Sequence, residues 1–237
     1  MSDPDLPPVA ILAGGLATRL RPTTEKIPKS LVEVAGRPFL WHQLRLLESR
    51  GIRQAILCAG YLGEMIQREA ASFDCGVQLH FSFDGERLLG TGGALRRALP
   101  LLPETFFVLY GDSYLLCDYR AIADSFLRSR KRGLMTVYRN EGRFDTSNVE
   151  YANGQIMRYQ KNQPDERMLH IDYGLGMFHR EVFEGLPDGQ FCDLAGIYAS
   201  LLREEQLAAF EVRERFYEVG SPEGLREAEA FLASPRS

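Results

Sequence analysis

Short apolar segments alternate with longer amphipathic stretches over the first 133 residues of the chain. Short apolar runs are typical of strands that are buried on both faces of a parallel sheet. The stretch that follows Pro38 carries Leu40, Leu44 and Leu47 at helical spacing and ends at Gly51, as a crossover helix would. This alternation predicts a doubly wound α/β sheet. The expected strands are 9–13, 54–59, 77–81 and 105–112, and the expected helices are 38–51, 62–73, 92–102 and 119–133.

The pattern changes after residue 133, where short β-prone segments follow one another. Asn153-Gly154 separates two of them and is the dipeptide typical of a two-residue hairpin turn. This part is therefore predicted to be β-rich and antiparallel, and the end of the chain returns to the α/β pattern. The expected elements are strands over 134–140, 148–151, 155–161 and 168–179, a helix near 191–204, strands over 207–212 and 215–220, and a helix from Pro222.

A chain of 237 residues with 45% hydrophobic and 25% charged residues is long enough to form one large globular domain. We predict a single domain over 1–237 of the α/β class. Its Rossmann-like mixed sheet is expected to be built from 9–133 and 191–237, with the β-rich segment at about 134–190 as an insertion.

The charge and the cysteines exclude several classes of protein. A formal charge of −4 gives no basic stripe for a nucleic acid, so nucleic acid is not an expected partner. The four cysteines form no C-x-x-C pair, which argues against a zinc knuckle or a disulfide scaffold and favours a reducing compartment. The first apolar run is too short to span a membrane or to act as a signal core, so we expect a cytoplasmic protein.

Residues 12–31, "LAGGLATRLRPTTEKIPKSL", concentrate glycine, arginine and lysine directly after a predicted strand. Gly14 and Gly15 lie where open α/β sheets bind ligands, and glycine lets backbone N–H groups approach a phosphate closely. The spacing matches neither the dinucleotide nor the Walker motif. Two glycines alone are equally consistent with a plain turn. Arg19 and Lys29, however, suit a polyphosphate and a charged leaving group.

The chain carries five motifs in order: "AGGLATRLRPT", "PKSLVEVAGRPFL", "LGTGGAL", "LYGD" and "YEVGSPEG". Together they span about residues 9–232 and resemble the sugar-1-phosphate nucleotidyltransferases, which join a nucleoside triphosphate to a sugar phosphate and release pyrophosphate. The resemblance implies a GT-A-like fold with a nucleotide-binding half over 9–133 and a sugar-binding part at about 134–190. The resemblance is strongest to bacterial enzymes that use GTP and heptose or mannose 1-phosphates in the synthesis of surface polysaccharides.

The resemblance also implies roles for individual residues, and Mg²⁺ as the cofactor. A sugar phosphate is already an anionic nucleophile, so the reaction needs alignment and charge neutralisation but no catalytic histidine or cysteine. The implied residues are Arg19, Lys29 and Asp112 for catalysis; Leu12, Ala13, Gly14, Gly15, Gly90, Thr91 and Gly92 for the nucleotide; Asn148, Lys161, Asp172 and Gly174 for the sugar phosphate; and Asp112 with Glu218 for the metal.

This chain departs from the family at three positions. Ala17 stands where the family usually has glycine, Glu218 where it usually has aspartate, and Gln160 where it often has glutamate. The resemblance therefore does not determine the geometry of the loop at Ala17, the geometry of the metal site at Glu218, or the sugar contacts of Gln160.

The sequence is also consistent with other roles for some of these residues and with other functions. Thr91 could cap a helix, Asp112 could cap the next turn, and Arg19 or Lys161 could be solvated charges. Uridylyl or cytidylyl transfer to another sugar 1-phosphate is the alternative reaction, and a non-catalytic regulatory homologue is the alternative class. A homo-oligomer is compatible with the resemblance, and no membrane partner is expected.

Overall fold

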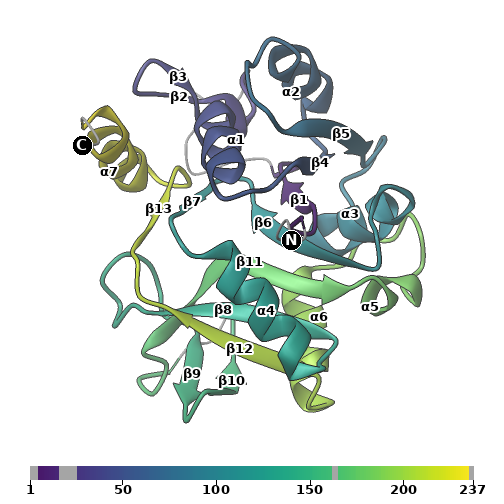
Figure 1. Cartoon of the computed structure of the whole chain (residues 1–237), viewed down its shortest axis with the longest axis vertical. Coiled ribbons are helices and arrows are strands. Elements are labelled where there is room, and N and C mark those ends of the chain that lie inside the picture. Colours follow the sequence, from purple (N-terminus) through teal and green to yellow (C-terminus); the bar gives the residue numbers. More distant parts are fainter. Residues whose placement is uncertain (1–4, 16–25, 162–164, 235–237) are drawn as a thin grey trace.

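The computed structural model describes residues 5–15, 26–161 and 165–234 (Figure 1). A nine-stranded mixed sheet runs through the molecule. Its parallel part has the order β5-β4-β1-β6, with β1 paired to β4 on one side and to β6 on the other. These strands are β1 (Val9–Leu12), β4 (Gln54–Ala59), β5 (Gln78–Phe83) and β6 (Thr105–Tyr110).

The sheet continues from β6 through β11, which runs in the opposite direction, to β8 and β12, which again run in the direction of β6. β11 pairs antiparallel with both β6 and β8, and β12 returns parallel to β8. A hairpin of β9 and β10 joins the start of β11 through the pair His170 and Val149. These strands are β8 (Gly133–Arg139), β9 (Val149–Ala152), β10 (Gln155–Tyr159), β11 (His170–His179) and β12 (Leu207–Val212). The predicted doubly wound mixed sheet is confirmed.

The two faces of the sheet are covered by different helices. In β1, Val9 and Ile11 face one apolar core and Ala10 faces the other, because side chains alternate along a strand. The first core is completed by α1 (Phe39–Ser49), α2 (Gly63–Ala70) and α4 (Tyr119–Ser129). The second core is completed by α3 (Gly90–Ala98), the 3-10 turn η4 (Leu99–Leu101), α5 (Glu181–Glu184) and α6 (Leu194–Arg203).

Local signals in the sequence account for some element boundaries and not for others. Asn153 and Gly154 both have positive φ, 52° and 78°, as a type I′ turn requires, so the predicted hairpin is confirmed. The prediction that the fourth helix continues to Gly133 is wrong. Arg130 leaves the helix with φ 55°, and Gly133 already begins β8, where a side chain would meet Leu201 and Phe178.

A second, two-stranded sheet lies beside the carboxyl end of β6. It pairs β7 (Ser113–Leu115) antiparallel with β13 (Phe216–Glu218), and Glu218 lies opposite Ser113. The N–H of Val219 donates to the carbonyl of Asp112 at 2.9 Å. This pairing brings Asp112 and Glu218 to one place although they lie far apart in sequence.

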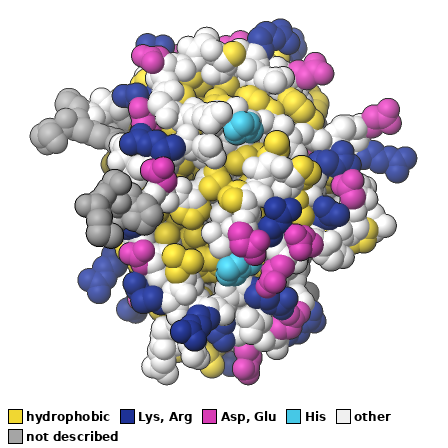
Figure 2. All heavy atoms as spheres, turned by 45° about the vertical axis from the view of Figure 1, so that its right-hand side comes forward, with side chains coloured by type: hydrophobic (Ala, Val, Ile, Leu, Met, Phe, Trp, Pro, Cys, Tyr) yellow, Lys and Arg dark blue, Asp and Glu magenta, His cyan; other side chains and the backbone are white. Residues whose placement is uncertain are grey.

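The last elements pack around this small sheet. The hairpin of β2 (Glu33–Val34) and β3 (Arg37–Pro38) and the final helix α7 (Pro222–Ala233) form a third apolar cluster with it. Figure 2 shows positive and negative side chains interspersed over one face of the molecule. Within the described ranges, no helix has both the length and the apolar character needed to cross a membrane. The division into one domain with three parts stays a prediction.

Two glycines offer a matched stability test. A Cβ on Gly111 would lie 2.6 Å from the carbonyl oxygen of Leu12, just beyond the carboxyl ends of β6 and β1. Gly196 is exposed in α6 and a Cβ there meets nothing within 4 Å. We expect Gly111→Ala to lower the free energy of unfolding by about 2 kcal/mol, because backbone must move. Gly196→Ala should raise it by about 0.5–1 kcal/mol through helix propensity. Urea unfolding of both variants measures the difference, and equal effects would contradict the close approach.

Candidate active site

Two cavities open side by side at the carboxyl edge of the parallel strands, which is where open α/β sheets bind ligands. The first has a volume of about 290 Å³ and the second about 370 Å³. Both are lined by Lys29, Tyr110 and Asp112, so these three residues form a shared boundary. Ligands in the two cavities would therefore meet at this boundary.

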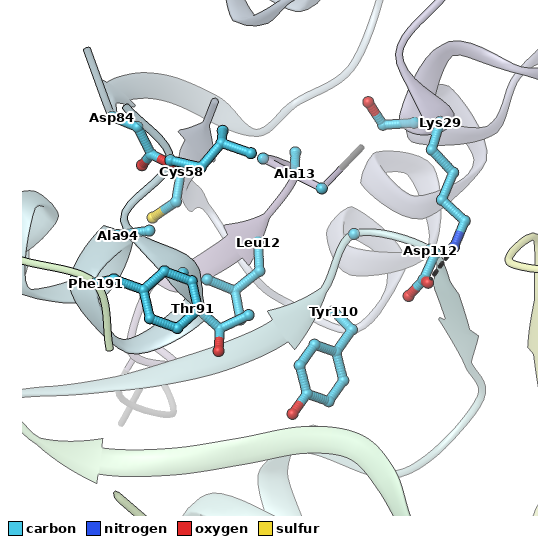
Figure 3. Close-up of a pocket in the computed structure, with 16 residues that line it drawn as sticks. Leu12, Ala13, Lys29, Cys58, Asp84, Thr91, Ala94, Tyr110, Asp112 and Phe191 are labelled. Carbon is cyan, nitrogen blue, oxygen red and sulfur yellow. Dashed lines mark hydrogen bonds and ion pairs between the residues drawn. The ribbon is translucent and has the colours of Figure 1, made fainter. Parts of the chain in front are cut away.

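The first cavity lies over the end of β1. In Figure 3, Asp84, Thr91 and Phe191 lie at one end of it, and Lys29 and Asp112 at the other. Ala13 continues the strand pairing with a hydrogen bond from its N–H to the carbonyl of Cys58 at 2.9 Å. All the nucleotide-binding residues that the sequence predicts line this cavity except Gly92: they are Leu12, Ala13, Gly14, Gly15, Gly90 and Thr91.

Gly92 instead holds the loop at the start of α3 against the segment before α6. Its N–H and that of Gly93 donate to the carbonyl of Cys192, at 2.8 and 3.2 Å. A Cβ on Gly92 would lie 2.8 Å from the Ile197 side chain. Gly92 is thus closely packed against this segment, and its predicted role in nucleotide binding stays a prediction.

Thr91 does not cap α3, so that alternative is wrong. Helix α3 begins at Gly90 after Leu89, and no side chain caps it. The Thr91 hydroxyl donates to Asp193 Oδ1 at 3.0 Å and accepts from the N–H of Leu194 at 2.8 Å. It therefore helps Asp193 to cap α6, and it fixes α6 beside the cavity.

Three charged side chains converge at the boundary of the two cavities. Lys29 Nζ lies 2.6 Å from Asp112 Oδ2, and the two side chains are 20% and 34% exposed. Glu218 accepts hydrogen bonds from the N–H of Gly220 and from Ser221 Oγ. A Cβ on Gly220 would lie 2.8 Å from Lys29 Nζ and would also meet Glu218 and Asp112. The predicted residues Lys29, Asp112 and Glu218 are thus brought together, whereas Arg19 and Ala17 lie outside the described residues.

This arrangement fits a magnesium ion that is also held by a substrate. Mg²⁺ is commonly bound by one or two protein carboxylates together with phosphate oxygens and water. Asp112 and Glu218 offer two carboxylates. Among the residues whose positions are described, no group of three or more His, Cys, Asp or Glu could form a complete protein cage. A metal here would need oxygen atoms from the substrates.

The second cavity is lined by β11 where that strand changes register. The register shifts between Asp172 and Gly176, and Gly174 has φ +98°, which favours glycine. Asp172 Oδ1 accepts from the N–H of Gly174 at 3.1 Å, and Tyr110 Oη lies 3.4 Å from Oδ2. Burial raises the pKa of Asp172 to about 6, although the Gly174 and Tyr110 hydrogen bonds oppose this rise.

The other two predicted sugar-phosphate residues, Asn148 and Lys161, are not among the residues that line this cavity. Asn148 Oδ1 accepts from the N–H of Asp172 at 2.9 Å, so it holds β11 in position. Lys161 Nζ lies 3.1 Å from Asp193 Oδ2. Burial opposes the ionisation of Asp193, but the hydrogen bonds from Ala195 and Lys161 keep its pKa below the usual value.

Asp84 lines the first cavity and was not identified from the sequence. Its side chain is 7% exposed and accepts from the N–H of Leu89 at 3.1 Å. Burial raises the pKa of Asp84 although that hydrogen bond opposes the rise. Burial and Asp84 together raise the pKa of the nearby Cys58 thiol to about 12, so Cys58 is not a nucleophile at neutral pH. In the sequence, Asp84-Gly85 after a strand has only the signature of a turn.

Asp145 lines the second cavity and was also missed. The loop that carries it is folded around Asn140, which is fully buried. Asn140 Nδ2 donates to the carbonyl of Asp145 at 2.6 Å and to Ser147 Oγ at 3.1 Å. Because these bonds fix the loop, Asp145 faces the cavity from a defined position. Nothing in the local sequence distinguishes this aspartate from a solvated loop residue.

The family model described as Nucleotidyl transferase matches residues 9–234. A Drosophila pseudoobscura pseudoobscura protein named mannose-1-phosphate guanylyltransferase catalytic subunit beta is 31% identical over 220 residues, covering 90% of this chain. A Synechocystis protein named UTP–glucose-1-phosphate uridylyltransferase is 30% identical over 232 residues, covering 87% of this chain. The chain spans only 58% of the length of each of these two relatives.

Solved structures show the same fold. HddC from Yersinia pseudotuberculosis, crystallised with GMP-PN, superposes with a TM-score of 0.80 at 24% identity, covering 96% of this chain and all of the other. A putative glucose-1-phosphate thymidylyltransferase from Bacillus anthracis superposes with a TM-score of 0.82 at 19% identity, covering 97% and 96% of the two chains. Together with the family match, which extends over almost the whole sequence, this confirms the resemblance seen in the motifs: the chain belongs to the nucleotidyl transferase family.

Proposed function

We propose that this protein transfers a nucleoside monophosphate from a nucleoside triphosphate to a sugar 1-phosphate, releasing pyrophosphate and forming a nucleotide sugar. The observation that carries the proposal is the pair of cavities that share Lys29, Tyr110 and Asp112. Two substrates that react with each other need adjacent sites with a common boundary. The names of the relatives support this class of reaction.

In this proposal the nucleoside triphosphate occupies the first cavity and the sugar phosphate the second. The triphosphate lies along Gly14 and Gly15 toward Lys29, with Arg19 as a further phosphate ligand. A phosphate oxygen of the sugar phosphate attacks the α-phosphorus in line and pyrophosphate leaves, so one P–O bond forms as another breaks. The attacking group is already an anion, so no general base is needed. Lys29 lowers the barrier by stabilising charge at the reacting phosphate.

We infer that Asp112 and Glu218 hold a magnesium ion at this boundary. When bound, the ion neutralises phosphate charge. Asp172, Asp145 and Gly174 bind the sugar hydroxyls in the second cavity. Lys161 is proposed to contact the sugar phosphate from the insertion, and Asn148 to support that contact by positioning β11.

The buried carboxylate of Asp84 favours guanine as the base. Guanine offers two adjacent donors, N1–H and the N2 amino group, which match the two oxygens of a carboxylate. Uracil offers a single N–H between two carbonyl acceptors, which a carboxylate repels. We therefore propose GTP as the nucleotide and D-glycero-D-manno-heptose 1-phosphate or a related sugar 1-phosphate as the acceptor, in surface polysaccharide synthesis in the cytoplasm. Relatives named as guanylyltransferases support this choice.

The direct test is a panel of nucleoside triphosphates against sugar 1-phosphates in the presence of magnesium, with pyrophosphate release as the readout. The proposal predicts the highest kcat/KM for GTP with a manno-configured sugar 1-phosphate. A preference for UTP or CTP would favour the alternative reaction. Failure of every pair would favour a non-catalytic homologue, which the presence of Arg19, Lys29 and Asp112 in the sequence argues against.

Lys29→Ala should reduce kcat by about a hundredfold, because a preorganised charge at the reacting phosphate is worth on the order of 3 kcal/mol. Lys26 is an exposed lysine of the same segment and serves as the control. Steady-state pyrophosphate release should be unchanged in Lys26→Ala. A kcat for Lys29→Ala close to that of the wild type would show that Lys29 does not stabilise the reacting phosphate.

Asp84→Asn should weaken discrimination between GTP and UTP by about tenfold or more, since a two-point contact to a base edge is worth about 1–3 kcal/mol. The amide keeps an oxygen for the N–H of Leu89 but no longer offers two acceptors to guanine. The ratio of kcat/KM values for the two nucleotides measures the effect. An unchanged ratio would show that Asp84 does not contact the base.

The raised pKa of Asp172 predicts a pH dependence of stability. The native state holds this proton up to about pH 6, whereas an unfolded aspartate loses it near pH 4, so the native state is penalised as the pH rises between these values. Asp172→Asn removes the penalty. Its free energy of unfolding relative to wild type should therefore increase from pH 4 to pH 7, by about 1–2 kcal/mol.

Urea unfolding at several pH values measures this difference. The exposed Asp124 of α4 provides the control, because Asp124→Asn removes a carboxyl group that is not buried. A difference for Asp172→Asn that is flat, or that falls as the pH rises, would contradict the assignment.

A further inference from the structure

Phe191 is the most exposed large apolar side chain among the described residues. It is 73% exposed, and the next, Leu127 on α4, is 60% exposed. Exposed apolar surface is unfavourable in water and often marks a place where a ligand binds. Phe191 also lines the first cavity, where its ring lies near Thr91 (Figure 3). The exposed ring is therefore available to a ligand bound in this cavity.

The segment that carries Phe191 is fixed by hydrogen bonds. The N–H of Cys192 donates to the carbonyl of Leu89 at 2.8 Å, and the Cys192 carbonyl accepts from Gly92 and Gly93. The ring packs against Gly90, where a Cβ would lie 2.9 Å from ring atom Cε2. A side chain on Gly90 would push the ring away. The structure thus holds an aromatic ring against the loop at the start of α3.

The ring lies at the end of the cavity that contains no lysine or arginine among its described lining residues. Ala94 and the buried Asp84 lie at the same end, whereas Lys29 and Asp112 are at the opposite end (Figure 3). A nucleoside triphosphate placed with its phosphates toward Lys29 would bring its base to this apolar end. The exposed ring would then be covered by the ligand.

We propose that Phe191 packs against the nucleobase and supplies binding energy that does not depend on which base is bound. This inference rests on the proposed function, because it assumes a nucleoside triphosphate in the first cavity. Every nucleobase has an apolar π-face, so any of the bases can pack on an aromatic ring. The ring is remote from Lys29 and the reacting phosphate, so its contact is the same in the ground state and the transition state. It should therefore affect KM and not kcat.

The experiment compares Phe191→Ala, Phe191→Tyr and the control Leu127→Ala. Calorimetric Kd values for GTP and UTP are measured without a sugar phosphate, and kcat and KM are measured with the best acceptor. We expect Phe191→Ala to weaken binding of both nucleotides by about tenfold, with kcat within twofold of wild type. Phe191→Tyr keeps the ring and should bind within about threefold of wild type. Leu127→Ala should behave as wild type in every measurement.

The possible results separate this inference from the proposed function. If wild type binds nucleotide and Phe191→Ala binds it within twofold as well, the role of Phe191 is wrong and the proposed function stands. If Phe191→Ala weakens GTP but not UTP, the ring is specific for one base and the inference is wrong in its central point. If wild type binds no nucleoside triphosphate, both proposals are overturned. Because the side chain is largely exposed, the melting temperature of Phe191→Ala should match that of wild type, which excludes misfolding as the cause.

Discussion

The parallel pairing of β1 with β4 and β6 determines where the charged groups of the candidate site can lie. It brings the carboxyl ends of three strands to one edge, so the chain leaves the sheet at Gly14, Gly60 and Gly111 within a small region. The approach is close enough that Gly14 and Gly60 leave no room for a side chain between them, and Gly111 contacts the backbone of Leu12. These glycines allow the chain to pass closely at this edge of the sheet. Lys29, Asp84 and Asp112 line the cavity there; Asp84 follows directly after β5, and Asp112 follows the Gly111 that comes after β6.

The electrostatics of the second cavity pose a problem that the proposed chemistry has to solve. Lys29 is the one cationic residue among its described lining residues, which also include Asp112, Asp145, Asp172 and Glu218. An anionic sugar phosphate would be repelled by these carboxylates without further positive charge. A magnesium ion on Asp112 and Glu218 would supply such charge. Burial also favours the neutral form of Asp172, which reduces the repulsion below about pH 6.

The sequence predicts those features that depend on short-range patterns. The alternation of apolar runs gives the buried strands, Asn153-Gly154 gives the hairpin, and the series of motifs gives the family. The structure adds contacts between segments that are distant in sequence. Thr91 has the sequence signature of a helix cap, but its hydroxyl is bound by Asp193 and Leu194. Asp84 and Phe191 could not be identified because turn-like and apolar residues become part of a site only once the chain has folded.

In the proposed reaction, the two substrates react directly at the boundary between the two cavities, without a nucleotide being attached to the protein. Exchange of radiolabelled pyrophosphate into the nucleoside triphosphate tests this most directly. Direct transfer predicts that label enters the triphosphate when the nucleotide sugar is present and that no exchange occurs with enzyme, magnesium and triphosphate alone. Exchange in the absence of any sugar phosphate or nucleotide sugar would show a nucleotidyl-protein intermediate and would contradict the account.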